Sequence, residues 1–116
     1  MRSVEFRKVY DEGTRFQTPL FAAFCLLMPE PGPTARIGFT TPRALGKAVK
    51  RNRIKRRLRE QMRLRLVPHL DPRWWLVINP RRSALDAPTT EIAAALDRLQ
   101  DRLRKLSRPS SADTSS

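Results

Sequence analysis

The segment from Gly46 to Glu60, GKAVKRNRIKRRLRE, most constrains the fold, because it holds eight Lys or Arg and a single acid. Like charges one helical turn apart repel each other and oppose helix formation. The apolar residues nevertheless recur at every fourth position, as one slowly drifting helical stripe: Ile54, Leu58, Met62 and Leu66. The spacing predicts a helix within the basic segment, about residues 46–66, that buries this stripe and keeps its cations on the other side.

The entry into this helix is constrained by two apolar residues outside the stripe. Leu45 and Val49 project onto the side opposite Ile54 on a helical wheel. One straight helix cannot bury both sets against one surface. We therefore expect a loop or turn before about Asn52, with Arg51–Arg53 at a bend where the chain enters the helix.

Two further helices follow from capping signals and periodicity. Ser3 is a candidate N-cap and Gly13 a candidate stop for a helix over residues 3–12. Pro88 suits the first turn of a last helix. Its leucine-rich stripe repeats at spacings of four and three: Ile92, Leu96, Leu99, Leu103 and Leu106.

Three apolar runs predict strands. LFAAFCLLM (residues 20–28) lies between two prolines and has strand length, although a short buried helix fits the pattern too. ARIGFTT alternates, and WWLVI (74–78) is rich in β-branched and aromatic residues. The order α-β-β-α-β-α predicts an α/β (α+β) two-layer sandwich in which helices cover a small sheet. Residues 1–106 form one predicted domain, and the tail 107–116 is expected to be disordered.

The charge balance indicates the class of partner. The 116 residues carry 24 Lys and Arg against 11 Asp and Glu, a net charge of +13. Such an excess attracts polyanions, and the predominance of Arg favours nucleic acid over an anionic membrane surface. No apolar run approaches the roughly 20 residues that span a bilayer, and the first ten residues have no signal core, so we expect a cytoplasmic protein.

Candidate catalytic groups are few. His69 is the single histidine and Cys25 the single cysteine, inside an apolar run. They offer neither a zinc site nor a Cys–His pair, and the acids form no cluster that a two-metal nuclease would need. The four glycines are scattered and make no phosphate loop. The sequence thus favours binding over catalysis by side chains.

Aromatic residues offer a second binding surface. Phe6 and Tyr10 lie one turn apart on the first predicted helix, and Phe24 lies in the middle of the first predicted strand. Aromatic rings stack on nucleobases of any sequence. In most proteins such rings belong to the hydrophobic core, and composition does not decide between the two roles.

The basic segment also resembles a known family. G-x-A-V-x-R-N-R within Gly46–Arg53 is similar to the signature of the protein subunit of bacterial ribonuclease P. The opening EFRKVYDEG, the strands PLFAAFCLL and ARIGF, and the closing WWLVINPR with its leucine-rich helix resemble the same family. Together these matches cover about residues 4–106.

The resemblance implies an RNA-binding subunit that assists a catalytic RNA in the endonucleolytic removal of the 5′ leader from precursor tRNA. In this family the protein binds the leader, stabilises the RNA and improves the binding of magnesium, the cofactor of the holoenzyme. Neither catalytic nor metal-binding residues are implied for the protein alone, which is expected to be a monomer.

Site residues follow from the motif positions. Contacts to the RNA subunit are implied for Lys47, Lys50, Arg51, Asn52, Arg53, Lys55, Arg56 and Arg57. The family's leader contacts, in a cleft between the first helix and the sheet, map onto Phe6, Tyr10 and Phe24. The family fold further implies a left-handed β-α-β crossover, against the usual hand.

Two features depart from the family. Its members usually begin with a longer basic stretch, and TTPRAL stands where a Ser-x-Lys-like entry is common. The alternatives are a ribosomal or other structural RNA-binding protein and a nuclease acting alone. The first gives no reason for the R-N-R triplet or for an aromatic cleft, and nuclease activity of the purified protein by itself would support the second.

Overall fold

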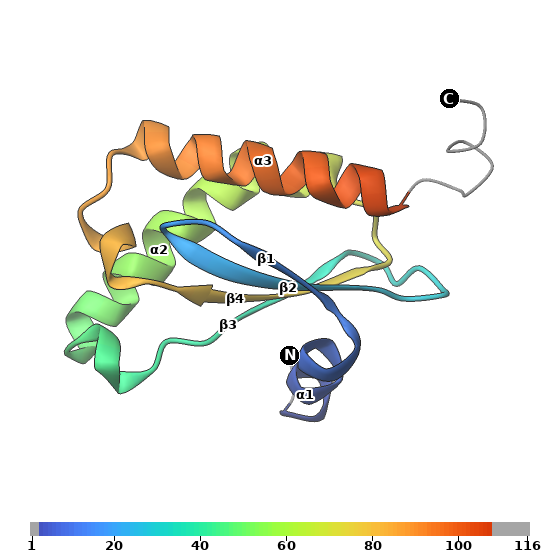
Figure 1. Cartoon of the computed structure of the whole chain (residues 1–116), viewed down its shortest axis with the longest axis horizontal. Coiled ribbons are helices and arrows are strands. Elements are labelled where there is room, and N and C mark those ends of the chain that lie inside the picture. The colour runs from blue at the N-terminus through green and yellow to red at the C-terminus, as the bar shows by residue number, and fades with distance from the viewer. Residues whose placement is uncertain (1–2, 108–116) are drawn as a thin grey trace.

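A four-stranded sheet with helices on both faces organises the chain in the computed structural model, which describes residues 3–107 (Figure 1). The helices and strands follow the order α1 Ser3–Glu12, β1 Thr14–Gln17, β2 Phe21–Leu27, β3 Arg36–Phe39, α2 Ala48–Arg65, β4 Trp74–Pro80 and α3 Thr89–Ser107. Short 3-10 turns stand at η1 Arg43–Leu45, η2 Val67–His69 and η3 Arg82–Leu85.

The sheet is mixed, with the strand order β1-β2-β4-β3. β2 pairs antiparallel with β1 and β4, whereas β3 runs parallel to β4. The chain passes from β3 to β4 through α2, because parallel neighbours need a long crossover. The predicted α+β sandwich and helical crossover are therefore confirmed, and the left hand of the crossover stays a prediction.

Strand β1 was absent from the predicted order, which had one strand too few. Its sequence TRFQ has one apolar residue, Phe16, so an alternating pattern is too short to recognise. The strand forms because Thr18 shapes a turn into β2. The Thr18 hydroxyl oxygen accepts the backbone N–H groups of Leu20 (3.1 Å) and Phe21 (3.0 Å). The order of helices and strands along the chain is thus corrected to α-β-β-β-α-β-α.

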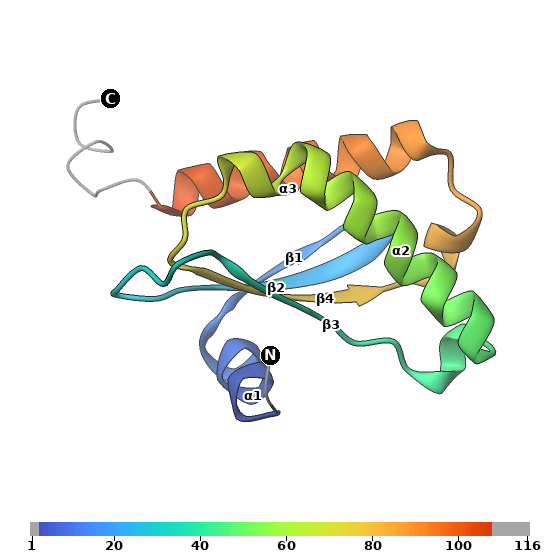
Figure 2. The same ribbon diagram turned by 180° about the vertical axis from the view of Figure 1, so that it is seen from behind.

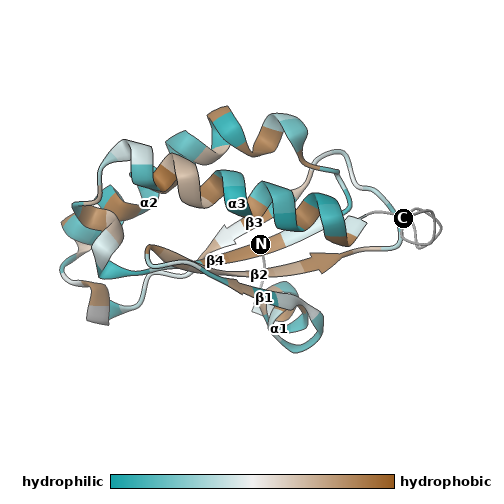
Figure 3. Cartoon of the chain, turned by 45° about the horizontal axis from the view of Figure 1, so that its top comes forward, coloured by the Kyte–Doolittle hydropathy of each residue, from teal (hydrophilic) through white to brown (hydrophobic). Residues whose placement is uncertain are grey.

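The two faces of the sheet are covered differently. α2 and α3 lie over one face and α1 lies over the other (Figures 1 and 2). Alternate residues of β2 and β4 point into the core beneath α2 and α3: Phe21, Ala23, Cys25, Leu76 and Ile78. Both strands are hydrophobic along most of their length, whereas α3 alternates between hydrophobic and hydrophilic positions (Figure 3).

The helices owe their bounds to local chemistry. The last backbone bond of α1 runs from the Gly13 N–H to the Val9 carbonyl oxygen at 2.8 Å, and a Cβ on Gly13 would approach that oxygen to 2.5 Å. α3 follows Pro88 as predicted and buries its stripe as far as Leu103, whereas Leu106 is exposed. An ion pair between Arg65 and Asp97, 3.1 Å long, links α2 to α3.

The break before α2 occurs earlier than predicted. Gly46 adopts a positive φ of 121°, which favours glycine, and α2 begins at Ala48. Arg51–Arg53 therefore lie inside the helix and not at a bend. The prediction failed because it assumed that Val49 would be buried, yet Val49 is 78% exposed while Leu45 is buried from η1.

Two further predictions concern the C-terminal tail and membrane-spanning segments. The predicted tail, apart from Ser107 at the end of α3, lies outside the described residues. Among residues 3–107, no helix is long and apolar enough to cross a membrane.

Burial of Cys25 predicts a pH-dependent reactivity. Desolvation raises the pKa of its thiol to about 12, although the positive charge of Arg102 acts in the opposite direction. An ordinary thiol has a pKa of about 8.5. The folded pKa is the higher one, so this group contributes stability that is complete below pH about 8.5 and is lost as the pH rises toward 12.

We expect Cys25 to react with iodoacetamide at pH 8.5 at least about 100-fold more slowly in the native protein than in guanidinium chloride, because the thiolate is the nucleophile. Mass spectrometry of quenched samples measures both rates. Equal rates in the folded and unfolded protein would contradict the burial of this side chain.

Candidate nucleic-acid interface

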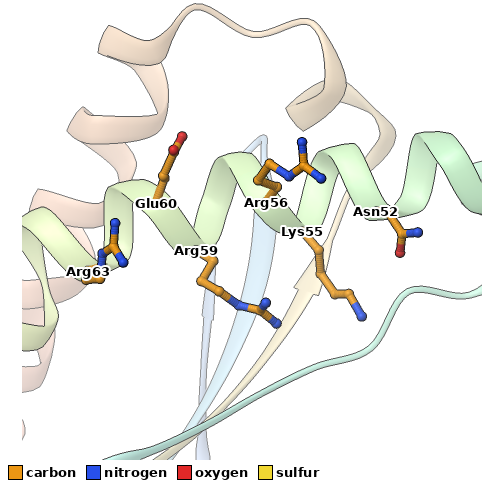
Figure 4. A pocket seen from close by; sticks show the side chains of 6 residues that line it. All are labelled: Asn52, Lys55, Arg56, Arg59, Glu60 and Arg63. Carbon is orange, nitrogen blue, oxygen red and sulfur yellow. The ribbon is translucent and has the colours of Figure 1, made fainter.

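The solvent face of α2 is a cationic surface. A shallow depression of about 470 Å³ lies along it, lined by Asn52, Lys55, Arg56, Arg59, Glu60 and Arg63. Lys55 and Arg59 point toward the segment that runs from β3 into α2, whereas Arg56 and Glu60 point away from that segment (Figure 4). We call these six residues the α2 face.

The charge of this surface has little compensation from the protein. Ten Lys or Arg fall between Lys47 and Arg65 against one acid, Glu60. Within residues 3–107, a salt bridge to another element reaches α2 at Arg65 alone, where Asp97 is the partner. The protein therefore leaves most of the repulsion between the cations of α2 uncompensated, and a bound polyanion would neutralise it.

Two predicted contact residues have structural partners instead of facing solvent. The half-buried Arg57 donates from Nη1 to the carbonyl oxygens of Ala84 and Leu85, both at 2.7 Å, and from Nη2 to that of Ala87. Arg51 is half-buried too and donates from Nη1 to the Thr41 carbonyl at 3.3 Å. These two arginines hold the η3 turn and the entry to α2 in place.

The remaining predicted residues divide between the α2 face and its start. Asn52, Lys55 and Arg56 belong to the α2 face. Lys47, Lys50 and Arg53 are exposed at the beginning of the helix. The prediction missed Arg59 and Arg63, which complete the α2 face. Their signal was available, because positions 52, 56, 59 and 63 continue one helical face at spacings of four and three.

A second surface forms where α1 crosses the sheet. The rings of Tyr10 and Phe24 meet edge to face, with centroids 4.7 Å apart and planes inclined by 76°. The guanidinium of Arg15 lies 5.7 Å from the Phe24 centroid. Phe6, one turn before Tyr10, is half-buried and lines a shallow depression of about 460 Å³ with it. We call Phe6, Tyr10, Arg15 and Phe24 the aromatic surface.

The aromatic surface is separate from the core. Among the described residues, the main core cluster includes none of the three predicted rings. Phe24 alternates with Ala23 and Cys25 along β2, so its ring points to the α1 face while theirs point to the core. Of the two roles that composition left open, the structure therefore favours an accessible surface.

A hydrogen-bond network orients Tyr10. Its hydroxyl donates to Asn79 Oδ1 on β4 at 2.9 Å, and the Thr40 hydroxyl donates to the same oxygen. Sequence reasoning missed Arg15, Thr40 and Asn79. Arg15 stands opposite Phe24 in the β1–β2 register, a relation that is invisible without β1.

The fold and its two surfaces define a small α+β nucleic-acid-binding domain, with a cationic helix on one side of the sheet and aromatic rings on the other. The family model described as Ribonuclease P matches residues 1–104. A ribonuclease P protein component from Symbiobacterium thermophilum is 40% identical over 103 residues, which cover 89% of this chain and 88% of that protein. Another, from Desulfovibrio desulfuricans, is 49% identical over 63 residues, covering 54% of this chain and 48% of that protein.

Solved structures agree in fold. A mutant ribonuclease P protein from Staphylococcus aureus superposes with a TM-score of 0.76 at 24% identity, covering 90% of this chain and 86% of that one. The ribonuclease P protein from Thermotoga maritima gives 0.74 at 24% identity, covering 88% and 94%. At this identity the likeness supports the fold alone.

This chain belongs to the ribonuclease P protein family. It is a protein component of the endoribonuclease that processes the 5′ ends of tRNA, and it works with an RNA subunit. The predicted identity, fold class and enzymatic role are thereby confirmed.

Two neighbouring arginines of α2 should differ in how much their replacement lowers the free energy of unfolding. Arg57→Ala removes the donors to three backbone carbonyls and should lower the free energy of unfolding by about 2 kcal/mol. Arg56→Ala removes an exposed cation and should change it by less than about 0.5 kcal/mol. Urea unfolding of both variants measures the difference, and equal destabilisation would contradict the structural role of Arg57.

Proposed function

We propose that this protein binds the catalytic RNA subunit through α2 and the 5′ leader of precursor tRNA through the aromatic surface. It stabilises the RNA and improves its magnesium binding, and it acts in the cytoplasm, entering the complex as a monomer. The observation that carries the proposal is that α2, which bears the cationic face, and α1, which bears Phe6 and Tyr10, lie on opposite sides of one sheet (Figure 1).

The RNA subunit suits the cationic side. Phosphates of a folded RNA neutralise several side chains at once and release counterions, which drives association. The exposed cations at the start of α2 and on the α2 face present a row of donors along one helix. Arg57 and Arg51 contribute by holding the helix against η3 and Thr41. The helix is thus presented to the RNA as a rigid element.

The leader suits the aromatic side. An unpaired strand exposes base faces that stack on aromatic rings without regard to sequence. Phe24 offers its ring between Tyr10 and the guanidinium of Arg15, which adds a cation for a neighbouring phosphate. The bond from Tyr10 to Asn79 holds this arrangement before RNA binds, so less entropy is lost on binding.

Catalysis is assigned to the RNA. Among the described residues, no group of three or more His, Cys, Asp or Glu lies close enough to hold a metal ion. Within residues 3–107, the side chains therefore offer no such group for a magnesium site of the protein's own. We propose that the RNA phosphates hold the magnesium ions and that the cations of α2 support the RNA fold that brings those phosphates together.

Reconstitution tests the proposal. We expect the protein alone to cleave nothing, and its addition to the RNA subunit to lower the magnesium concentration needed for 5′ processing of precursor tRNA. Arg53→Ala should weaken RNA-subunit binding and reduce the slope of log affinity against log salt by about one unit, one lost phosphate contact. A protein without effect on processing at any magnesium concentration would overturn the proposal, as would nuclease activity of the purified protein.

The aromatic surface is tested by Phe24→Ala. The variant should weaken holoenzyme binding of precursor tRNA by about tenfold, since stacking contributes about 1–3 kcal/mol per base, and should leave binding of mature tRNA unchanged. Filter binding with matched substrates measures both affinities. Equal losses for the two substrates would show that Phe24 acts through stability and not through the leader.

A further inference from the structure

A groove lies at the open edge of the sheet, between β3 and α2. It has a volume of about 250 Å³ and is lined by Ile37, Phe39, Arg59, Met62, Arg63 and Val67. Figure 2 shows this side of the molecule, with β3 running below α2. The groove lies on the α2 side of the sheet, whereas the aromatic surface lies on the α1 side, so the two are separate. We call it the β3–α2 groove.

The groove combines an apolar floor with a cationic rim. Phe39 is half-buried, and the guanidinium of Arg59 lies 5.5 Å from its ring centroid. Val67 leaves 43% of its surface exposed at the end of the groove. Arg59 and Arg63 belong to the α2 face as well, so the groove opens directly onto the cationic surface.

Backbone groups at the edge add hydrogen-bonding capacity. In the order β1-β2-β4-β3, β3 pairs with β4 on one side, and no other described strand covers its outer side. The Thr40 N–H donates to the Ile78 carbonyl at 3.0 Å, so residues at even positions of β3 direct their backbone groups toward β4. By alternation, the N–H and C=O groups of Ile37 and Phe39 point outward.

We propose that the β3–α2 groove receives one unpaired nucleobase of the RNA subunit, an inference that rests on the proposed function. The base would stack on the apolar floor around Phe39, and its flanking phosphates would lie at Arg59 and Arg63. Its hydrogen-bonding edge would meet the outward backbone groups of β3. An unpaired base is required because only a splayed-out base exposes both its face and its edge to a protein.

Charge and size favour a nucleotide over a peptide strand added to β3. A peptide would satisfy the backbone edge but would leave Arg59 and Arg63 without counter-charges, beside further cations of α2. A nucleotide supplies a ring, an edge and a phosphate together. The groove volume lies just below the range of about 300–1,000 Å³ for sites of drug-sized ligands, which suits a single ring system.

A matched pair of variants tests the inference in the full-length protein. Val67→Asp places a charge at the end of the groove, and Leu64→Asp places the same charge three residues away on α2. Leu64 is 66% exposed and does not line the groove. Each is bound to the reconstituted RNA subunit, and the reactivity of base edges toward dimethyl sulfate and a carbodiimide is mapped with and without protein.

We expect the wild-type protein to protect at least one unpaired base that Val67→Asp exposes again, with an affinity loss of about tenfold. Leu64→Asp should keep that protection and lose less than about threefold in affinity. The same protections with both variants would overturn the inference while the proposed function stands. A wild-type protein that self-associates through this edge, with Val67→Asp preventing it and no base responding, would overturn it as well. Failure of the wild-type protein to bind the RNA subunit would overturn the proposed function itself.

Discussion

Burial of the apolar stripe of α2 is the contact on which the rest of the structure depends. Ile54, Leu58 and Met62 are buried between the sheet and α3, each at 2% exposure or less. This burial holds an 18-residue helix whose own cations repel one another. Because the stripe occupies one side of α2, the cations must occupy the other, and their density there follows directly from the packing. The buried stripe and the exposed cations therefore share one helix without sharing its surface.

The alternation of β2 separates two further roles in the same way. Ala23 and Cys25 point toward α3 and belong to the core. Phe24 lies between them in β2, points toward α1 and belongs to the aromatic surface. Arg57 belongs to a run of cations, yet its guanidinium donates to the backbone carbonyls of Ala84 and Leu85. A residue's role in this protein thus depends on which side of an element it occupies more than on its chemical type.

Local patterns predicted the long elements well. Residues 3–12 and the leucine-rich last helix needed only a cap, a stop and a repeat, all of which act over a few residues. β1 was not predicted because its four mostly polar residues show no periodicity. The strand forms by pairing with β2. The bend was misplaced because Val49 was assigned to the core by its type, whereas Gly46 determines where the helix begins.

The sequence by itself determined the family motif, the excess of positive charge, the buried stripe of α2 and the shortage of catalytic groups, because each is a property of composition or short-range spacing. Only the tertiary structure decided which arginines of α2 bond to backbone carbonyls, which stay exposed, and which rings form a surface. Tyr10 meets Asn79 across 69 positions of sequence, and Arg57 reaches a turn 27 to 30 residues away. Such contacts depend on how the sheet and helices pack, which no local pattern encodes.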